Sequence, residues 1–190
     1  MRLKIRDLAD HTILAGAGLG RQLLSQLIAQ TSVNEAPGVV FLDFQGIRVA
    51  TSSFLRESVL GFRDFLLSTP TGKYVAVANL AAPVVEELAF LLTHRGDAFW
   101  ACTLNATDRP TDARLIGKLD EVHESTFRRV LELGLASAPE LASLQDDEDA
   151  VGTTAWNNRL QALTSRGILK ERRTGKTKVF SPVLEAYNGS

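Results

Sequence analysis

The sequence has one cysteine, three histidines and no long apolar segment, and each shortage excludes a class of protein. A single thiol, Cys102, allows no internal disulfide, which is typical of proteins in a reducing cytoplasm. No stretch approaches the ~20 consecutive apolar residues that a membrane-spanning helix needs. The charged start MRLKIRDLAD does not have the pattern of a signal peptide. We therefore expect a cytoplasmic protein that has no membrane partner.

Patterns for metal binding and catalysis are also scarce. His11, His94 and His123 are far apart and have no ligand-spaced cysteine or acid pair beside them, so no metal site is expected. The stretch AGAGLGR is similar to a dinucleotide-binding loop, but Arg21 stands where G-x-G-x-x-G requires its third glycine. These glycines are expected to form a turn into a helix. We expect no cofactor and no enzyme activity.

What remains is the composition of a globular chain, with 45% hydrophobic residues, 23% charged residues and a formal net charge of -1. In the first hundred residues, apolar runs alternate with helical patterns. APGVVFLDF, KYVAVANL and DAFWACTLNA are typical of buried strands, and the first of them indicates a strand covered on both faces. It ends near Asp43, which has no charged partner close by in the sequence and is expected to be structural. Strands alternating with helices predict an α/β fold with a mostly parallel sheet.

The pattern changes after about residue 105. A polar connector, NATDRPTDAR, precedes three helical patterns, LIGKLDEVHESTFRRVLELG, SAPELASLQ and TTAWNNRLQALTSRG. ILKERRTGKTKVFSPV then predicts two short strands around Thr174-Gly175. Three helices and a basic hairpin follow the order of a winged helix-turn-helix. We therefore divide the chain into an α/β domain (1–105), a connector (106–117) and a winged-helix domain (118–190). The winged-helix domain should have its own small core containing Leu160, Leu163 and Ile168.

Both halves resemble known families. The first half resembles the STAS-like family of unknown function, which is related to the anti-sigma-factor antagonists. The resemblance rests on the opening strand MRLKIRDL, GRQLLSQL entering a helix, VVFLDFQGI on the central strand and TSSFLRESVLG entering the next helix. Its most specific part is LDFQGIRVATSSFLRE, residues 42–57. Residues 118–184 resemble winged-helix domains broadly, a likeness that indicates a fold more than a function.

Three consecutive hydroxyl residues, Thr51, Ser52 and Ser53, precede the second of these helices. Ser52 or Ser53 can cap the helix by accepting a hydrogen bond from a free backbone N–H. The resemblance implies a second role, because antagonists of this kind begin the same helix with Asp-Ser-Ser-Gly and a partner kinase phosphorylates the first serine. That serine corresponds to Ser52, although Thr51 and Phe54 replace the Asp and the Gly. Candidate phosphorylation sites are Ser52, Ser53 and Thr51, and a histidine-kinase-type ATPase is a candidate partner.

The end of the chain is locally basic. Residues 151–190 contain seven lysines and arginines against two glutamates, Glu171 and Glu185. Most of the basic residues fall on the predicted third helix and hairpin, where a winged helix contacts phosphates, although a solvated basic hairpin would have the same composition. Asparagine can pair with adenine in the major groove. The expected DNA-binding residues are Asn157, Asn158, Arg159, Arg172, Arg173, Lys176 and Lys178.

One segment opposes DNA binding. QDDEDAVG places four acidic residues beside the third helix, where they would repel phosphate. These residues are Asp146, Asp147, Glu148 and Asp149. Two functions therefore remain open. The chain is either a transcriptional regulator whose α/β domain receives a signal, or a protein–protein adaptor of the anti-sigma, partner-switching type whose winged helix does not touch DNA.

Overall fold

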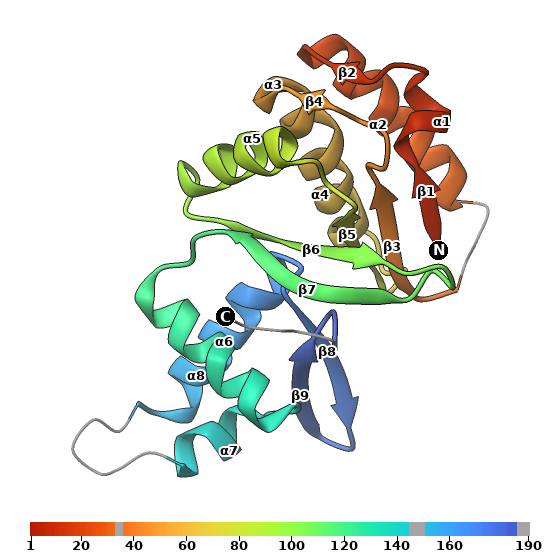
Figure 1. The fold of residues 1–190 in the computed structure, drawn as a ribbon. Coiled ribbons are helices and arrows are strands. Elements are labelled where there is room, and N and C mark those ends of the chain that lie inside the picture. Colours follow the sequence, from red (N-terminus) through yellow and green to blue (C-terminus); the bar gives the residue numbers. More distant parts are fainter. Residues whose placement is uncertain (33–35, 145–150, 186–190) are drawn as a thin grey trace.

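The structure is a computed structural model that describes residues 1–32, 36–144 and 151–185 (Figure 1). Its centre is a five-stranded sheet in the order β1-β3-β5-β6-β7, in which β7 is antiparallel and the other strands are parallel. This confirms the predicted α/β fold with a mostly parallel sheet. The strands are β1 (Arg2–Lys4), β3 (Gly38–Asp43), β5 (Lys73–Ala78), β6 (Ala98–Leu104) and β7 (Pro110–Gly117).

The connecting helices lie on one face of the sheet. The parallel strands follow one another across the sheet in chain order, so right-handed crossovers carry each helix to the same side (Figure 1). These helices pack apolar side chains such as Leu27, Val59 and Leu88 against one side of β3 and β5. The helices are α2 (Ala17–Ser32), α3 (Ser52–Leu55), η1 (Arg56–Leu60), α4 (Gly61–Ser68) and α5 (Ala82–Thr93).

Glycines let the first of these helices pack closely. Gly16 has φ of 86° and forms the turn before α2. Gly20, one turn later, faces α3 so closely that a Cβ atom would lie 2.7 Å from the carbonyl oxygen of Phe54. The glycines of AGAGLGR therefore serve a turn and a helix–helix contact. Beside this contact, the short strands β2 (Ile13–Leu14) and β4 (Val49–Ala50) form a parallel pair.

The C-terminal part of the chain covers the second face of the sheet (Figure 1). Phe41 and Trp100 from the sheet share a buried cluster with Phe127 from α6 and Phe180 from β9. The elements of this part are α6 (Glu121–Leu133), α7 (Ala138–Ser143), α8 (Thr153–Ser165), β8 (Leu169–Thr174) and β9 (Thr177–Pro182). Their order and the turn at Gly175 agree with the elements predicted from the sequence. Ser137 caps α7 through a capping box. None of the described helices is both long and apolar enough to span a bilayer.

Two predictions about the division of the chain are wrong. Residues 110–117 are strand β7 instead of a connector, because Ala113 and Ile116 turn inward and the segment pairs with β6. Leu160, Leu163 and Ile168 do not form a core of their own, since they belong to the same buried cluster as Trp100. The physical reason is the bare second face of the sheet, whose apolar side chains require a cover.

The start of the chain also differs from its predicted form. MRLKIRDL alternates like one strand, but β1 ends at Lys4 and the short helix α1 (Ile5–Ala9) follows. Ile5 is fully buried, and Asp10 ends the helix in the left-handed region with φ of 51°. A strand of three residues at the edge of the sheet is enough to pair with β3.

Candidate functional site

The hydroxyl cluster lies where β4 meets α3. Thr51 is the cap of the helix, since its side chain accepts a hydrogen bond of 3.4 Å from the backbone N–H of Phe54. The same oxygen accepts one of 3.2 Å from the N–H of Gly16 and lies 3.1 Å from the hydroxyl of Ser53. The cap is therefore Thr51 and neither of the serines, which corrects the sequence prediction.

Ser52 instead faces a carboxylate. Its backbone N–H donates a hydrogen bond of 3.0 Å to Oε2 of Glu87, and its hydroxyl donates to the same oxygen. Glu87 lies on α5, 35 residues further along, so no local sequence pattern connects the two residues. A phosphate on Ser52 would place its negative charge beside this carboxylate and break both contacts. Phosphorylation of Ser52, Ser53 or Thr51 stays a prediction. At Ser52 it would disrupt the contact with Glu87.

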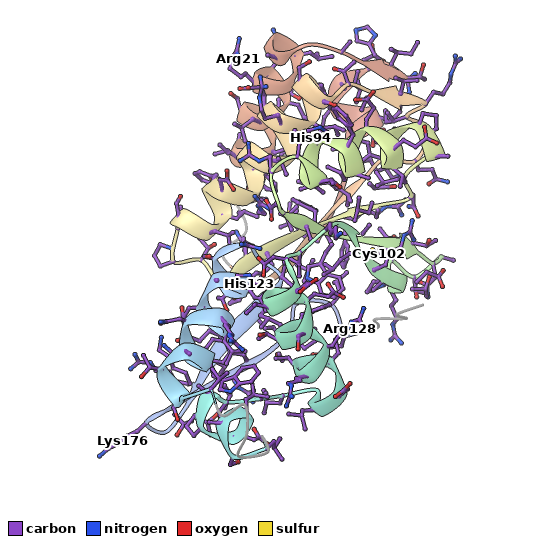
Figure 2. The ribbon with its side chains drawn as sticks, turned by 90° about the vertical axis from the view of Figure 1, so that its left-hand side faces the viewer. Arg21, His94, Cys102, His123, Arg128 and Lys176 are labelled. Atoms are coloured by element: carbon purple, nitrogen blue, oxygen red, sulfur yellow. The ribbon has the colours of Figure 1, made fainter. Side chains whose placement is uncertain are left out.

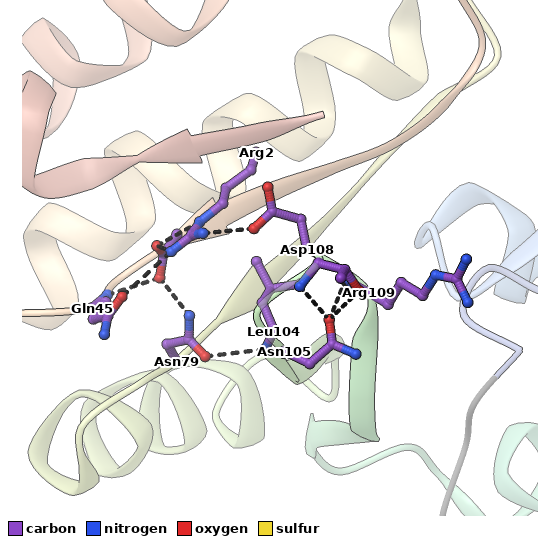
Figure 3. Close-up of polar contacts among 9 residues, drawn as sticks. Arg2, Gln45, Asn79, Leu104, Asn105, Asp108 and Arg109 are labelled. Carbon is purple, nitrogen blue, oxygen red and sulfur yellow. Dashed lines mark hydrogen bonds and ion pairs between the residues drawn. The ribbon is translucent and has the colours of Figure 1, made fainter.

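A second polar cluster lies at the carboxyl ends of β3 and β5, where Arg2, Gln45 and Asn79, labelled in Figure 3, surround Asp43. Asp43 is only 1% exposed, and Arg2 donates to its Oδ2 with distances of 2.9 Å from Nε and 2.6 Å from Nη2. Its Oδ1 accepts hydrogen bonds from the backbone N–H of Gln45 at 3.0 Å and from Nδ2 of Asn79 at 2.8 Å. The charged partner that the neighbouring sequence lacks is supplied by β1.

The protonation state of Asp43 follows from this cluster. Burial alone would raise the pKa of the carboxyl, but the hydrogen bonds from Asn79, the Gln45 N–H and Arg2 outweigh burial and lower the pKa. These four hydrogen bonds occupy the lone pairs of both oxygens. Asp43 is therefore a charged structural anchor with no free oxygen for proton transfer, in agreement with its expected structural role.

The cluster also ties the β6–β7 turn to the first strand. Nη1 of Arg2 donates to Oδ1 of Asp108 at 2.6 Å (Figure 3). Asn79, which has φ of 56°, accepts the N–H of Leu104 at 3.1 Å. Asn105 holds the turn itself by accepting the N–H groups of Thr107 and Arg109. No local sequence pattern predicts this cluster, because its members are separated by up to 106 residues.

The predicted DNA-binding residues of α8 are not equally accessible. Asn158 is exposed and Asn157 is half-buried. The guanidinium of Arg159 lies 5.0 Å from the centre of the buried Trp156 ring, and that of Arg129 lies 5.6 Å from it. Arg159 thus stacks on the ring of Trp156 in its own helix. The sequence prediction placed Arg159 near base edges instead.

The basic residues of the hairpin fall on different sides. Residues opposite each other in an antiparallel pair share one face, so Arg173 and Lys178 lie together while Arg172 lies on the other face with Val179. Lys176 is at the tip of the hairpin and extends away from the rest of the molecule (Figure 2).

A shallow groove of about 360 Å³ joins the hairpin to the start of α8. It brings Asn157 together with Lys176 and Lys178, although the two lysines are some twenty residues further along the chain. Lys178 also pairs with Glu171 at 3.1 Å, which leaves Lys176 as the freest cation of this groove. The acidic residues Asp146, Asp147, Glu148 and Asp149 lie outside the described residues.

The turn between α8 and β8 forms the junction with the sheet half. The buried Arg63 of α4 pairs with Asp97 at 2.8 Å, and a Cβ atom on Gly167 would lie 3.8 Å from its side chain. Arg166 donates to the carbonyl of Gly96 at 3.4 Å. The helix that starts at the hydroxyl cluster therefore ends against the C-terminal half. This contact is not visible in the sequence, because arginine is usually exposed and Gly167 lies far along the chain.

The described parts of the chain contain no group of three or more histidine, cysteine, aspartate or glutamate side chains that could hold a metal ion. Burial raises the pKa of the Cys102 thiol to about 12, so it is a poor nucleophile. No protein-family model, curated protein or solved structure matches this chain.

Proposed function

We propose that the protein is a non-enzymatic transcriptional regulator in which a STAS-like α/β half receives a signal and a winged-helix half binds duplex DNA. The observation that carries the proposal is the groove that joins Asn157 to Lys176 and Lys178. It combines an amide that can read a base edge with cations that can meet phosphates. The order of three helices and a hairpin supports the same reading.

In this proposal, α8 is the helix that enters the major groove and the β8–β9 hairpin is the wing. The first turns of α8 carry the exposed Thr153, Thr154 and Asn158. Lys176 at the tip of the hairpin reaches the backbone beside the groove, and Arg173 shares the face of Lys178. Phosphate contacts would supply most of the affinity and Asn157 the sequence preference.

The α/β half is the proposed receiver. The N-terminus of α3 carries the hydroxyl cluster, and the same continuous helix meets the C-terminal half where the side chains of Arg63 and Leu67 lie beside Gly167. A kinase-type ATPase that phosphorylates Ser52 would act at one end of this helix, where the added charge repels Glu87. The structural change would reach the C-terminal half at the other end of this helix, beside the turn at Gly167.

A second candidate function is that of a protein–protein adaptor, and one observation favours it. The exposed positions of α8, which are Thr153, Thr154, Asn158 and Ser165, carry no positive charge, and Arg159 is folded over Trp156. A helix that enters the major groove usually offers cations to the phosphates on either side. An adaptor would use this neutral polar surface for a protein.

Salt-dependent DNA binding distinguishes the two functions. Fluorescence anisotropy with a pool of labelled duplexes should detect binding at low salt. Lys176→Gln with Lys178→Gln should then weaken binding to every duplex and reduce the slope of log K against log salt by about 2 units. The matched control is Lys4→Gln with Arg48→Gln, which removes two exposed charges far from the hairpin and should leave the slope unchanged. If the parent chain binds no duplex at low salt, the adaptor is the better description.

A further inference from the structure

A second groove, of about 520 Å³, separates the outer face of the hairpin from the sheet half. Pro37 and Tyr74 line it at the amino ends of β3 and β5, and Leu135 lines it after α6. Lys170 and Arg172 of β8 form the opposite wall. The volume lies within the range of sites that hold small organic molecules. All of its lining residues belong to the described part of the chain.

One side of this groove is apolar. Leu135 is 42% exposed although it is a large hydrophobic residue, and the ring of Tyr74 is half-buried beside it. Burial raises the pKa of Tyr74, so its hydroxyl stays protonated at neutral pH. Gly134, with φ of 70°, leaves open space beside Leu135, because a Cβ atom there would meet nothing within 4 Å. These walls suit a flat apolar group.

The opposite wall carries one unbalanced charge. Lys170 is paired with Glu185 at 3.0 Å. The carboxylate of Glu171 is turned to the other face of the hairpin, where it meets Gln161 and Lys178. Arg172 is exposed, and within the described ranges its guanidinium has no hydrogen-bond or ion-pair partner, although its backbone pairs with Val179. The guanidinium of Arg172 is therefore the charge that a ligand in this groove would meet.

We propose that this groove binds a small organic anion, namely a carboxylate attached to an aromatic or other apolar body. The planar guanidinium of Arg172 matches a carboxylate through two parallel hydrogen bonds. The body would pack against Tyr74 and Leu135, which line the same groove as Arg172. The ligand would thus touch both the sheet half and the hairpin.

At this position the ligand would regulate DNA binding. This part of the inference rests on the proposed function. Arg172 and Arg173 are neighbours on opposite faces of β8. The anion would bind one face of the hairpin, while Lys178 and the DNA-facing groove lie on the other. A ligand that fixes the hairpin against the sheet would change the presentation of Lys176 to DNA.

Binding of simple probes to the full-length protein tests the site without DNA. The probes are benzoate and phenylacetate, with benzamide and phenylacetamide as neutral counterparts, and binding is followed by isothermal titration calorimetry. We expect the carboxylates to bind with Kd on the order of 1 mM, as fragments of this size do, and the amides at least tenfold more weakly. In two-dimensional NMR of the unmodified protein, the amide shifts should concentrate on residues around Tyr74, Leu135 and Arg172.

Two variants of adjacent residues sharpen the test. Arg172→Gln should weaken carboxylate binding at least tenfold, whereas Arg173→Gln removes the same charge from the opposite face and should leave the Kd unchanged. Arg172→Lys should give an intermediate loss, because it keeps the charge and removes the planar fork. Equal binding by the parent and Arg172→Gln, NMR shifts located elsewhere, or no binding of either carboxylate at millimolar concentration would overturn the proposal. None of these outcomes depends on whether the protein binds DNA.

Discussion

The indole nitrogen of Trp100 donates a hydrogen bond of 2.9 Å to the backbone carbonyl of Ile168, which lies 68 residues further along the chain. Both residues are buried in the cluster that joins the sheet to the C-terminal half. The bond fixes the turn between α8 and β8 against strand β6 of the sheet. The two halves are therefore parts of one packed structure, and their stabilities should be linked.

Replacing Trp100 by Phe tests this linkage. The change removes the indole donor and opens a small cavity, while the carbonyl of Ile168 keeps its hydrogen bond of 3.2 Å from the N–H of Val183, so the free energy of unfolding should fall by roughly 1–3 kcal/mol. Urea unfolding followed by circular dichroism and by tryptophan fluorescence, which comes from Trp100 and Trp156 in the parent and from Trp156 alone in the variant, should give one coincident transition for each protein. Phe90→Ala, at a position that is 61% exposed, is the control and should change stability by less than about 0.5 kcal/mol. Two separate transitions would contradict the shared core.

Asp43→Asn should make the protein less stable in a pH-dependent way. Because the folded pKa of Asp43 is lowered, its charged form stabilises the fold above the unfolded pKa of about 3.9, and this contribution is lost as the pH falls through the lower folded value. We expect a loss of about 1–3 kcal/mol at pH 7 that shrinks below about pH 4. Urea unfolding of parent and variant across this range measures it.

Asp108→Asn is the matched control for this experiment. It removes a carboxylate from the same guanidinium of Arg2, but Asp108 is exposed to solvent and its ion pair is screened. The loss should stay below about 1 kcal/mol. A stability difference between the parent and Asp43→Asn that is the same at pH 7 and pH 3 would show that the charge of Asp43 is not what stabilises the cluster.

Charge at Ser52 should act through Glu87. Ser52→Ala removes one hydrogen bond and should cost about 1 kcal/mol. Ser52→Glu places a second carboxylate beside Glu87 and should cost more, and Glu87→Gln should recover part of that loss. A double-mutant cycle in urea unfolding should give a coupling energy of about 1 kcal/mol. If Ser52→Glu is as stable as Ser52→Ala in both backgrounds, the proposed repulsion is absent.

The thiol of Cys102 should report on opening of the interface between the halves. It is 4% exposed within the shared cluster, and burial, with a smaller contribution from Asp43, raises its pKa to about 12, although Arg114 opposes the shift. A disulfide reagent at pH 8 should therefore modify the native protein only as fast as the whole chain unfolds. Rapid modification without loss of circular dichroism would mean that the C-terminal half leaves the sheet on its own.

The sequence predicts the local elements well and their assembly poorly. The run GVVFLD indicates a strand buried on both faces, and the structure confirms this, since Val40 and Leu42 are buried on one face and Phe41 on the other. The same observation argues against two separate cores, because something must cover the second face. The helical spacing in α6 and α8 shows which side chains are buried but contains no information on the surface that buries them. Strand β7 was missed because its polar start and Pro110 are typical of a loop.

For the candidate sites, too, the sequence predicts single residues but not which residues come together in the fold. Lys176 and Asn157 were identified from residue type and charge, and the structure brings them to one groove. The faces of Arg172 and Arg173 require the register of the hairpin, which sequence composition does not provide. Glu87 and Arg2 were missed because their partners are 35 and 41 residues away.

The cover on the second face of the sheet has a consequence for protein synthesis. The strands of the sheet are complete at Gly117, but their apolar second face is closed only by residues 118–184. A ribosome adds about 5–20 residues per second, so roughly 3–13 s pass between the two events. During that time Phe41 and Trp100 face water or a chaperone. Folding of the strands is therefore completed by residues 118–184, and a truncated chain that stops before α6 should aggregate because its apolar second face stays exposed.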